Sequence, residues 1–71
     1  MTKAEFNDMF FTAYCQLYNA EEGSPAEHRA RGEIDALKRI TRRIYGRDEA
    51  HEIRHRAAKS ADFVIYGRDE E

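Results

Sequence analysis

Helix-starting and helix-ending residues divide this chain into three segments, and this punctuation limits the folds it can adopt more than any other feature. Ser24 and Pro25 form a strong helix start, because the serine hydroxyl and the fixed φ of proline both suit a first turn. Thr2 and Glu5 have the spacing of a capping box, and Gly46 follows the last apolar pair of the middle segment.

Apolar residues recur at three- and four-residue spacing in each segment, as expected for one face of a helix. We predict helices at about residues 3–19, 25–45 and 49–66, followed by an acidic tail at 67–71. The predicted fold class is therefore all-α, a small three-helix bundle that forms a single helical domain over residues 1–71.

The six-residue sequence IYGRDE occurs twice, at residues 44–49 and 65–70. Its isoleucine and tyrosine end an apolar face, and its glycine suits the left-handed conformation that closes a helix. In the first copy, Asp48 is expected to be the N-cap of the third helix. We interpret the repeat as a sequence that ends helices. The alternative is that the two copies are equivalent surface features recognised by a partner.

The first helix is apolar around much of its circumference. Its apolar arc spans roughly 200°, so the helix must touch two neighbours, or one neighbour and another chain. The core is also thin, and at about 25 cal/mol per Å² of buried apolar surface it barely offsets the entropy of folding. We therefore expect a homodimer formed through the aromatic face of this helix. The interface residues are Phe10, Phe11, Tyr14 and Tyr18.

Charge is distributed unevenly, although the formal net charge is only −2. Residues 1–37 carry three bases against seven acids, residues 38–60 eight bases against three acids, and residues 61–71 one base against four acids. A basic middle between acidic ends indicates a surface for an anionic partner. Arginine predominates there, as is usual where carboxylates or phosphates are bound by paired hydrogen bonds.

The basic segment supports three interpretations: an acidic protein partner, nucleic acid, or a solvated face that balances the acidic ends. We favour a small non-enzymatic regulator or inhibitor that binds an acidic surface of a larger protein, by analogy with short accessory or phage-encoded regulators. The alternative is a nucleic-acid-binding regulator, against which the pI of about 5.9 counts. The predicted partner-binding residues are Arg39, Arg42, Arg43, Arg56 and Lys59, with Phe63 and Tyr66 as apolar anchors.

Residues 51–55 match H-E-x-x-H, in which two histidines one turn apart bind zinc and the glutamate activates a water molecule. Arg54 would place a cation beside the metal, and no convincing third ligand follows. We expect a solvated helix face with Glu52 and Arg56 as an exposed ion pair. The sequence thus predicts no catalytic residue, no metal and no cofactor.

Two further expectations concern the environment of the chain. Cys15 is the only cysteine and is expected to stay a reduced thiol. No stretch approaches the roughly 20 apolar residues that span a membrane. We expect a cytoplasmic protein without membrane contact.

Two charged residues fall within the apolar arcs of the second and third helices, namely Glu33 and Arg54. A buried charge is costly unless it is paired. We expect these two side chains to form an ion pair that fixes the register of the two helices.

Overall fold

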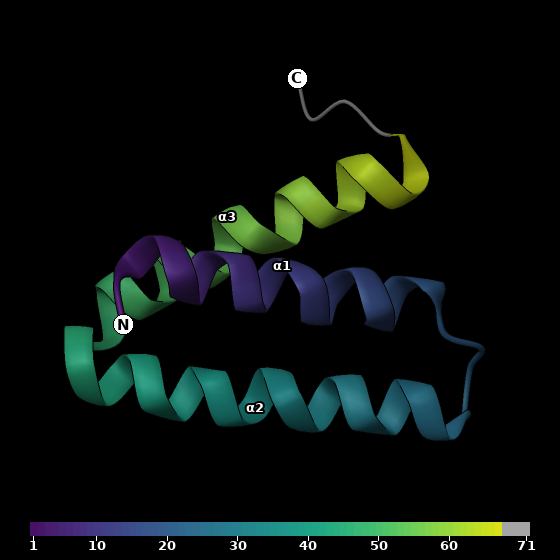
Figure 1. Cartoon of the computed structure of the whole chain (residues 1–71), viewed down its shortest axis with the longest axis horizontal. Helices are drawn as coiled ribbons and strands as arrows, with labels where there is room; N and C mark the ends of the chain where they lie inside the picture. Colours follow the sequence, from purple (N-terminus) through teal and green to yellow (C-terminus); the bar gives the residue numbers. More distant parts are fainter. Residues whose placement is uncertain (68–71) are drawn as a thin grey trace.

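The computed structural model describes residues 1–67, which form three helices (Figure 1). They are α1 (Lys3–Asn19), α2 (Pro25–Tyr45) and α3 (Arg47–Tyr66), without a strand in this described part. The predicted all-α, three-helix fold is confirmed. Residues 68–71, which hold most of the predicted tail and the end of the second IYGRDE copy, lie outside the described residues. No helix within the described range is long and apolar enough to cross a membrane.

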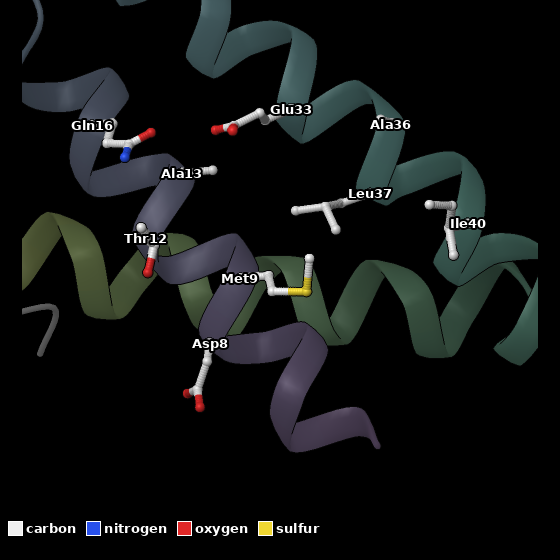
Figure 2. A pocket seen from close by; sticks show the side chains of 9 residues that line it. All are labelled: Asp8, Met9, Thr12, Ala13, Gln16, Glu33, Ala36, Leu37 and Ile40. Atoms are coloured by element: carbon white, nitrogen blue, oxygen red, sulfur yellow. The ribbon is translucent and has the colours of Figure 1, made fainter. Parts of the chain in front are cut away.

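The helices make a flat molecule of 32 × 31 × 17 Å. α1 and α2 run antiparallel beside each other, and α3 crosses α1 so that its C-terminal half diverges from α2 (Figure 1). Seen from the groove between α1 and α2, α3 lies behind the pair (Figure 2). The opposite side of this pair is not covered by any described helix.

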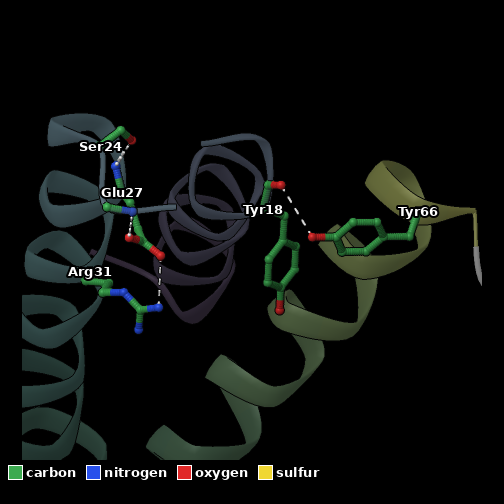
Figure 3. Close-up of polar contacts among 6 residues, drawn as sticks. Tyr18, Ser24, Glu27, Arg31 and Tyr66 are labelled. Atoms are coloured by element: carbon green, nitrogen blue, oxygen red, sulfur yellow. Dashed lines mark hydrogen bonds and ion pairs between the residues drawn. The ribbon is translucent and has the colours of Figure 1, made fainter. Parts of the chain in front are cut away.

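Side chains fix the starts of α1 and α2, as predicted. The Thr2 hydroxyl accepts a hydrogen bond from the Glu5 amide at 3.1 Å, and the Glu5 carboxylate accepts one from the Thr2 amide at 2.7 Å. At α2, the Ser24 hydroxyl accepts from the Glu27 amide at 3.2 Å (Figure 3). The Glu27 carboxylate also accepts from the Gly23 amide at 2.7 Å. These bonds satisfy amides that the first turn of a helix leaves without partners.

Gly46 alone joins α2 to α3, and it adopts φ 88° and ψ 170°, a conformation almost confined to glycine. Its amide donates to the Arg42 carbonyl at 3.0 Å, which closes α2. α3 begins at Arg47 without a side-chain cap, so the prediction of Asp48 as its N-cap is wrong. The backbone of the glycine, rather than a capping side chain, reverses the chain, and Asp48 lies inside the first turn. Gly67 closes α3 in the left-handed conformation.

One core lies where α1 meets both other helices. α1 contributes large aromatic side chains, whereas α3 contributes mainly alanines, which let its backbone approach α1 closely. Thr41 is fully buried, and its hydroxyl donates to the Leu37 carbonyl at 2.8 Å, so this polar group is satisfied within α2. The core residues are Phe6, Phe10, Ala13 and Tyr14 of α1, Ile34 and Leu37 of α2, and Ile53, Ala57 and Ala61 of α3.

The aromatic face that we predict to join two chains is used largely within one chain. Phe10 is fully buried and Tyr14 is 8% exposed, so neither side chain can reach a second copy in this fold. Phe11 and Tyr18 are half-buried and pack against the core. The wide apolar arc of α1 is explained by two neighbours in the same chain, α2 and α3.

Candidate functional site

A small groove lies between α2 and α3 near their Gly46 turn, with a volume of about 130 Å³. Thr41 and Ala50 are its buried members. Four cationic side chains and a histidine make up the rest of the lining, which includes no carboxylate from the described residues. We call this site the α2–α3 groove, and it is lined by Lys38, Thr41, Arg42, Arg47, Ala50, His51 and Arg54.

The groove is built from two helical stripes. Lys38 and Arg42 are four residues apart on α2, while Arg47, His51 and Arg54 follow at intervals of four and three on α3. Such spacing places side chains on one side of a helix. The tight turn between the helices then brings the two stripes together, so positive charge collects on both sides of the groove. A groove of this charge favours an anionic ligand.

Arg54 is held at the groove by two contacts. Its guanidinium donates to the Tyr14 hydroxyl at 3.4 Å and to Nδ1 of His51 at 3.0 Å. The predicted ion pair with Glu33 is not formed among the described residues. Glu33 is exposed and lines a different groove, between α1 and α2 (Figure 2). The two charges therefore lie on different sides of α2.

The groove cations have no carboxylate partner among residues 1–67, whereas three other bases do. Lys3 of α1 forms an ion pair with Glu49 of α3, and Arg31 lies 3.1 Å from Glu27 (Figure 3). The predicted pair of Arg56 and Glu52 also forms, at 4.0 Å. Within residues 1–67, no ion pair involves the five bases that cluster around the end of α2, namely Lys38, Arg39, Arg42, Arg43 and Arg47. Nor does Arg54 meet a carboxylate in that range.

The predicted partner-binding bases are divided by the structure. Arg42 lines the α2–α3 groove, and it also lies beside Arg39 and Arg43 around Ile40 on the outer side of α2. Arg56 instead lines a groove between α1 and α3. Lys59 is exposed on α3. The structure thus brings together the three α2 arginines and leaves the two α3 bases elsewhere.

The predicted apolar anchors lie at the far end of α3. Phe63 follows Arg47 by about 24 Å of helix, at 1.5 Å per residue. It is 58% exposed. The Tyr66 ring lies 5.5 Å from the Tyr18 ring, and its hydroxyl donates to the Tyr18 carbonyl at 3.3 Å (Figure 3). Tyr66 therefore ties the end of α3 to α1, whereas Phe63 presents an apolar surface well away from the groove.

The H-E-x-x-H segment forms an exposed flank of α3. The His51 and His55 rings stack with centroids 5.8 Å apart. Because a guanidinium cannot accept a hydrogen bond, Nδ1 of His51 is the acceptor from Arg54 and the ring proton lies on Nε2. A zinc ion bound through Nε2 would require the ring proton to move to Nδ1. Nδ1 could then no longer accept the hydrogen bond from Arg54, and this contact would be lost. Among residues 1–67, no three histidine, cysteine or acidic side chains are grouped to hold a metal.

Cys15 is half-buried on α1. Burial raises the pKa of its thiol. A thiol with a raised pKa is a poor nucleophile at neutral pH.

Comparison of the chain with known protein families, with curated proteins and with solved structures finds no match.

Proposed function

We propose that this chain is a small non-enzymatic regulatory protein that binds an acidic surface of a larger protein through the α2–α3 groove. The observation that carries the proposal is the cluster of cations around one groove without carboxylate partners. Like charges gathered in this way repel one another, so an acidic ligand would relieve the repulsion. Arginine also presents the planar fork that binds a carboxylate by two hydrogen bonds.

The size of the groove favours binding over turnover. Sites for small molecules usually have volumes of about 300–1,000 Å³. The α2–α3 groove, at about 130 Å³, is large enough for one acidic side chain rather than for a whole substrate. Its neighbours Arg39 and Arg43 extend the positive surface along α2 and would meet further acidic groups.

Nucleic acid is the second candidate ligand, because consecutive α2 bases could follow a phosphate backbone. The acids that begin α3 weigh against it. Asp48 and Glu49 are both exposed in the first turn, next to Arg47. The whole chain is also acidic, with a formal charge of −2. A phosphate backbone laid across the groove would meet these carboxylates, whereas a protein surface can place its acids selectively.

The proposal extends to location and assembly. We place its action in the cytoplasm, where a lone cysteine stays reduced. We also retain the homodimer, although a second copy would have to bind somewhere other than Phe10 and Tyr14, because these fill the core.

Affinity capture from host lysate tests the proposal, with the tagged full chain and half of each sample treated with nuclease. We expect a stoichiometric protein that survives nuclease, is lost with Arg42→Glu and is retained with Arg29→Glu. Arg29 is exposed on α2 and distant in sequence from the groove residues, so it makes a matched control. Capture of nucleic acid alone, or equal loss with both variants, contradicts the proposal.

A further inference from the structure

The side of the α1–α2 pair opposite α3 carries an exposed apolar groove of about 490 Å³ (Figure 2). Met9 projects into it from α1 and Ile40 borders it on α2, and these side chains are 42% and 46% exposed. Ile44, one turn beyond Ile40, is 56% exposed. We call this surface the α1–α2 face. Apolar side chains this exposed, gathered on one side of a small domain, are typical of a binding surface.

The two edges of the α1–α2 face carry opposite charges. Asp8 lies beside Met9 on the α1 edge, while Arg39 and Arg43 lie beside Ile40 on the α2 edge. All three charged side chains are exposed, and none forms an ion pair with any of residues 1–67. Around Met9 and Ile40 the face is therefore acidic along one edge, apolar in the middle and basic along the other, while Glu33 adds a carboxylate from α2 further along the groove.

The charged residues of the two edges also lie at the same height along the helix axes. The Phe6 and Tyr45 rings are in contact, with centroids 6.0 Å apart, where α1 and α2 run antiparallel. Two residues further along α1 and two residues back along α2 lead to Asp8 and Arg43. With the same rise per residue in both helices, these side chains are level across the groove.

We propose that the α1–α2 face binds the same face of a second copy of this chain. Rotation by 180° about an axis parallel to the helices exchanges the two edges and keeps the level of each residue. Asp8 of one copy then faces Arg43 of the other, and the contact occurs twice, as in a two-fold interface. The apolar centres meet on the axis, and the two helix pairs form a four-helix bundle with α3 of each copy outside.

The charge pattern selects a second copy over an unrelated partner. An acidic partner would match only the α2 edge, and a basic partner only the α1 edge, whereas the chain itself is complementary to both. The additional apolar contact also suits a domain of 71 residues, because domains of this size have few core residues. The groove of the α1–α2 face and the α2–α3 groove share no lining residue. The dimer would thus leave the α2–α3 groove open, but Arg39 and Arg43, at the edge of the dimer contact, would no longer be available to the acidic partner.

Sedimentation equilibrium of the full chain over a range of concentrations tests this dimer, with circular dichroism to confirm folding. We expect the wild-type chain to dimerise and Ile40→Asp to weaken dimerisation by about tenfold or more. Val64→Asp is the matched control, because Val64 is 61% exposed on α3 and lies off the proposed face. A monomeric wild-type chain at high concentration, or an equal loss with Val64→Asp, overturns the proposal.

Charge reversal gives a sharper result. Asp8→Arg and Arg43→Asp should each weaken self-association, because each variant places like charges opposite each other. A mixture of the two single variants should form a heterodimer, since every contact between them is again between opposite charges, and the double variant should recover the dimer. Folded single variants that fail to associate when mixed overturn the proposed pairing.

Discussion

Glu27 joins three parts of the α2 start, because its amide donates to Ser24 and its carboxylate accepts from Gly23 and Arg31. The hydrogen bond from the Gly23 amide, followed by the one from Arg31, lowers the pKa of Glu27. The folded chain therefore binds this proton less readily than the unfolded chain does. The contribution to stability is present above the ordinary glutamate pKa of about 4.3 and is lost as the pH falls through the lower folded value.

The variant Glu27→Gln should accordingly be less stable than wild type at neutral pH and equally stable in acid. Thermal midpoints measured from about pH 7 down to about pH 3 test this expectation. Glu22→Gln is the control, because Glu22 is exposed and forms no hydrogen bond or ion pair within residues 1–67. A difference between wild type and Glu27→Gln that stays constant with pH contradicts it.

Glu33 and Arg54 show that the contacts of a single residue could not be predicted from its own helix. A helical wheel gives the direction of a side chain around its own helix, but not which neighbour occupies that direction. Both residues fall within an apolar arc, yet Glu33 points to the side of α2 next to α1 and Arg54 to the side of α3 next to α2. The helical spacing of the basic residues that line the α2–α3 groove was visible in the sequence. That these residues form one groove depended on how α3 packs against α2.

At the scale of the helices, starts that depend on local contacts were predicted well. The capping contacts of α1 and α2 join residues only three apart, so the sequence specifies them directly. The start of α3 depends instead on the backbone conformation of Gly46, which is outside the usual left-handed helix region. Gly67 adopts that usual conformation, so the two IYGRDE copies close their helices differently.

Two glycine substitutions test this account of the turn. Gly46→Ala should reduce the free energy of unfolding by about 1–3 kcal/mol, because its φ and ψ are almost confined to glycine. Gly32→Ala, inside α2, should increase it by about 0.5–1 kcal/mol. A Cβ at either position meets no atom within 4 Å, so the comparison isolates the backbone. Denaturant unfolding provides the measurement, and effects of the same sign at both sites contradict the account.

At the scale of the whole molecule, the wide apolar arc of α1 has a different explanation from the one predicted. The sequence allowed two neighbours in the same chain or one neighbour and a second chain. Which arrangement forms depends on the course of α3, and that course is set by long-range packing of Ala57 and Ala61 against α1. The alanines on the inner face of α3 predict a close approach to a neighbouring helix, but they do not specify which aromatic residues they contact.

The same packing places the α2–α3 groove and Phe63 at opposite ends of α3, so a partner that uses both must cover most of this helix.

Ionic contacts are screened by salt, whereas burial of an aromatic ring is not. Partner binding should therefore weaken as salt is raised, and Arg42→Glu should reduce both the affinity and this salt dependence. Phe63→Ala should lower the affinity by about tenfold and leave the salt dependence unchanged. Binding isotherms for the captured partner at several salt concentrations measure both quantities. An unchanged affinity with Phe63→Ala would confine the partner to the groove end of the molecule.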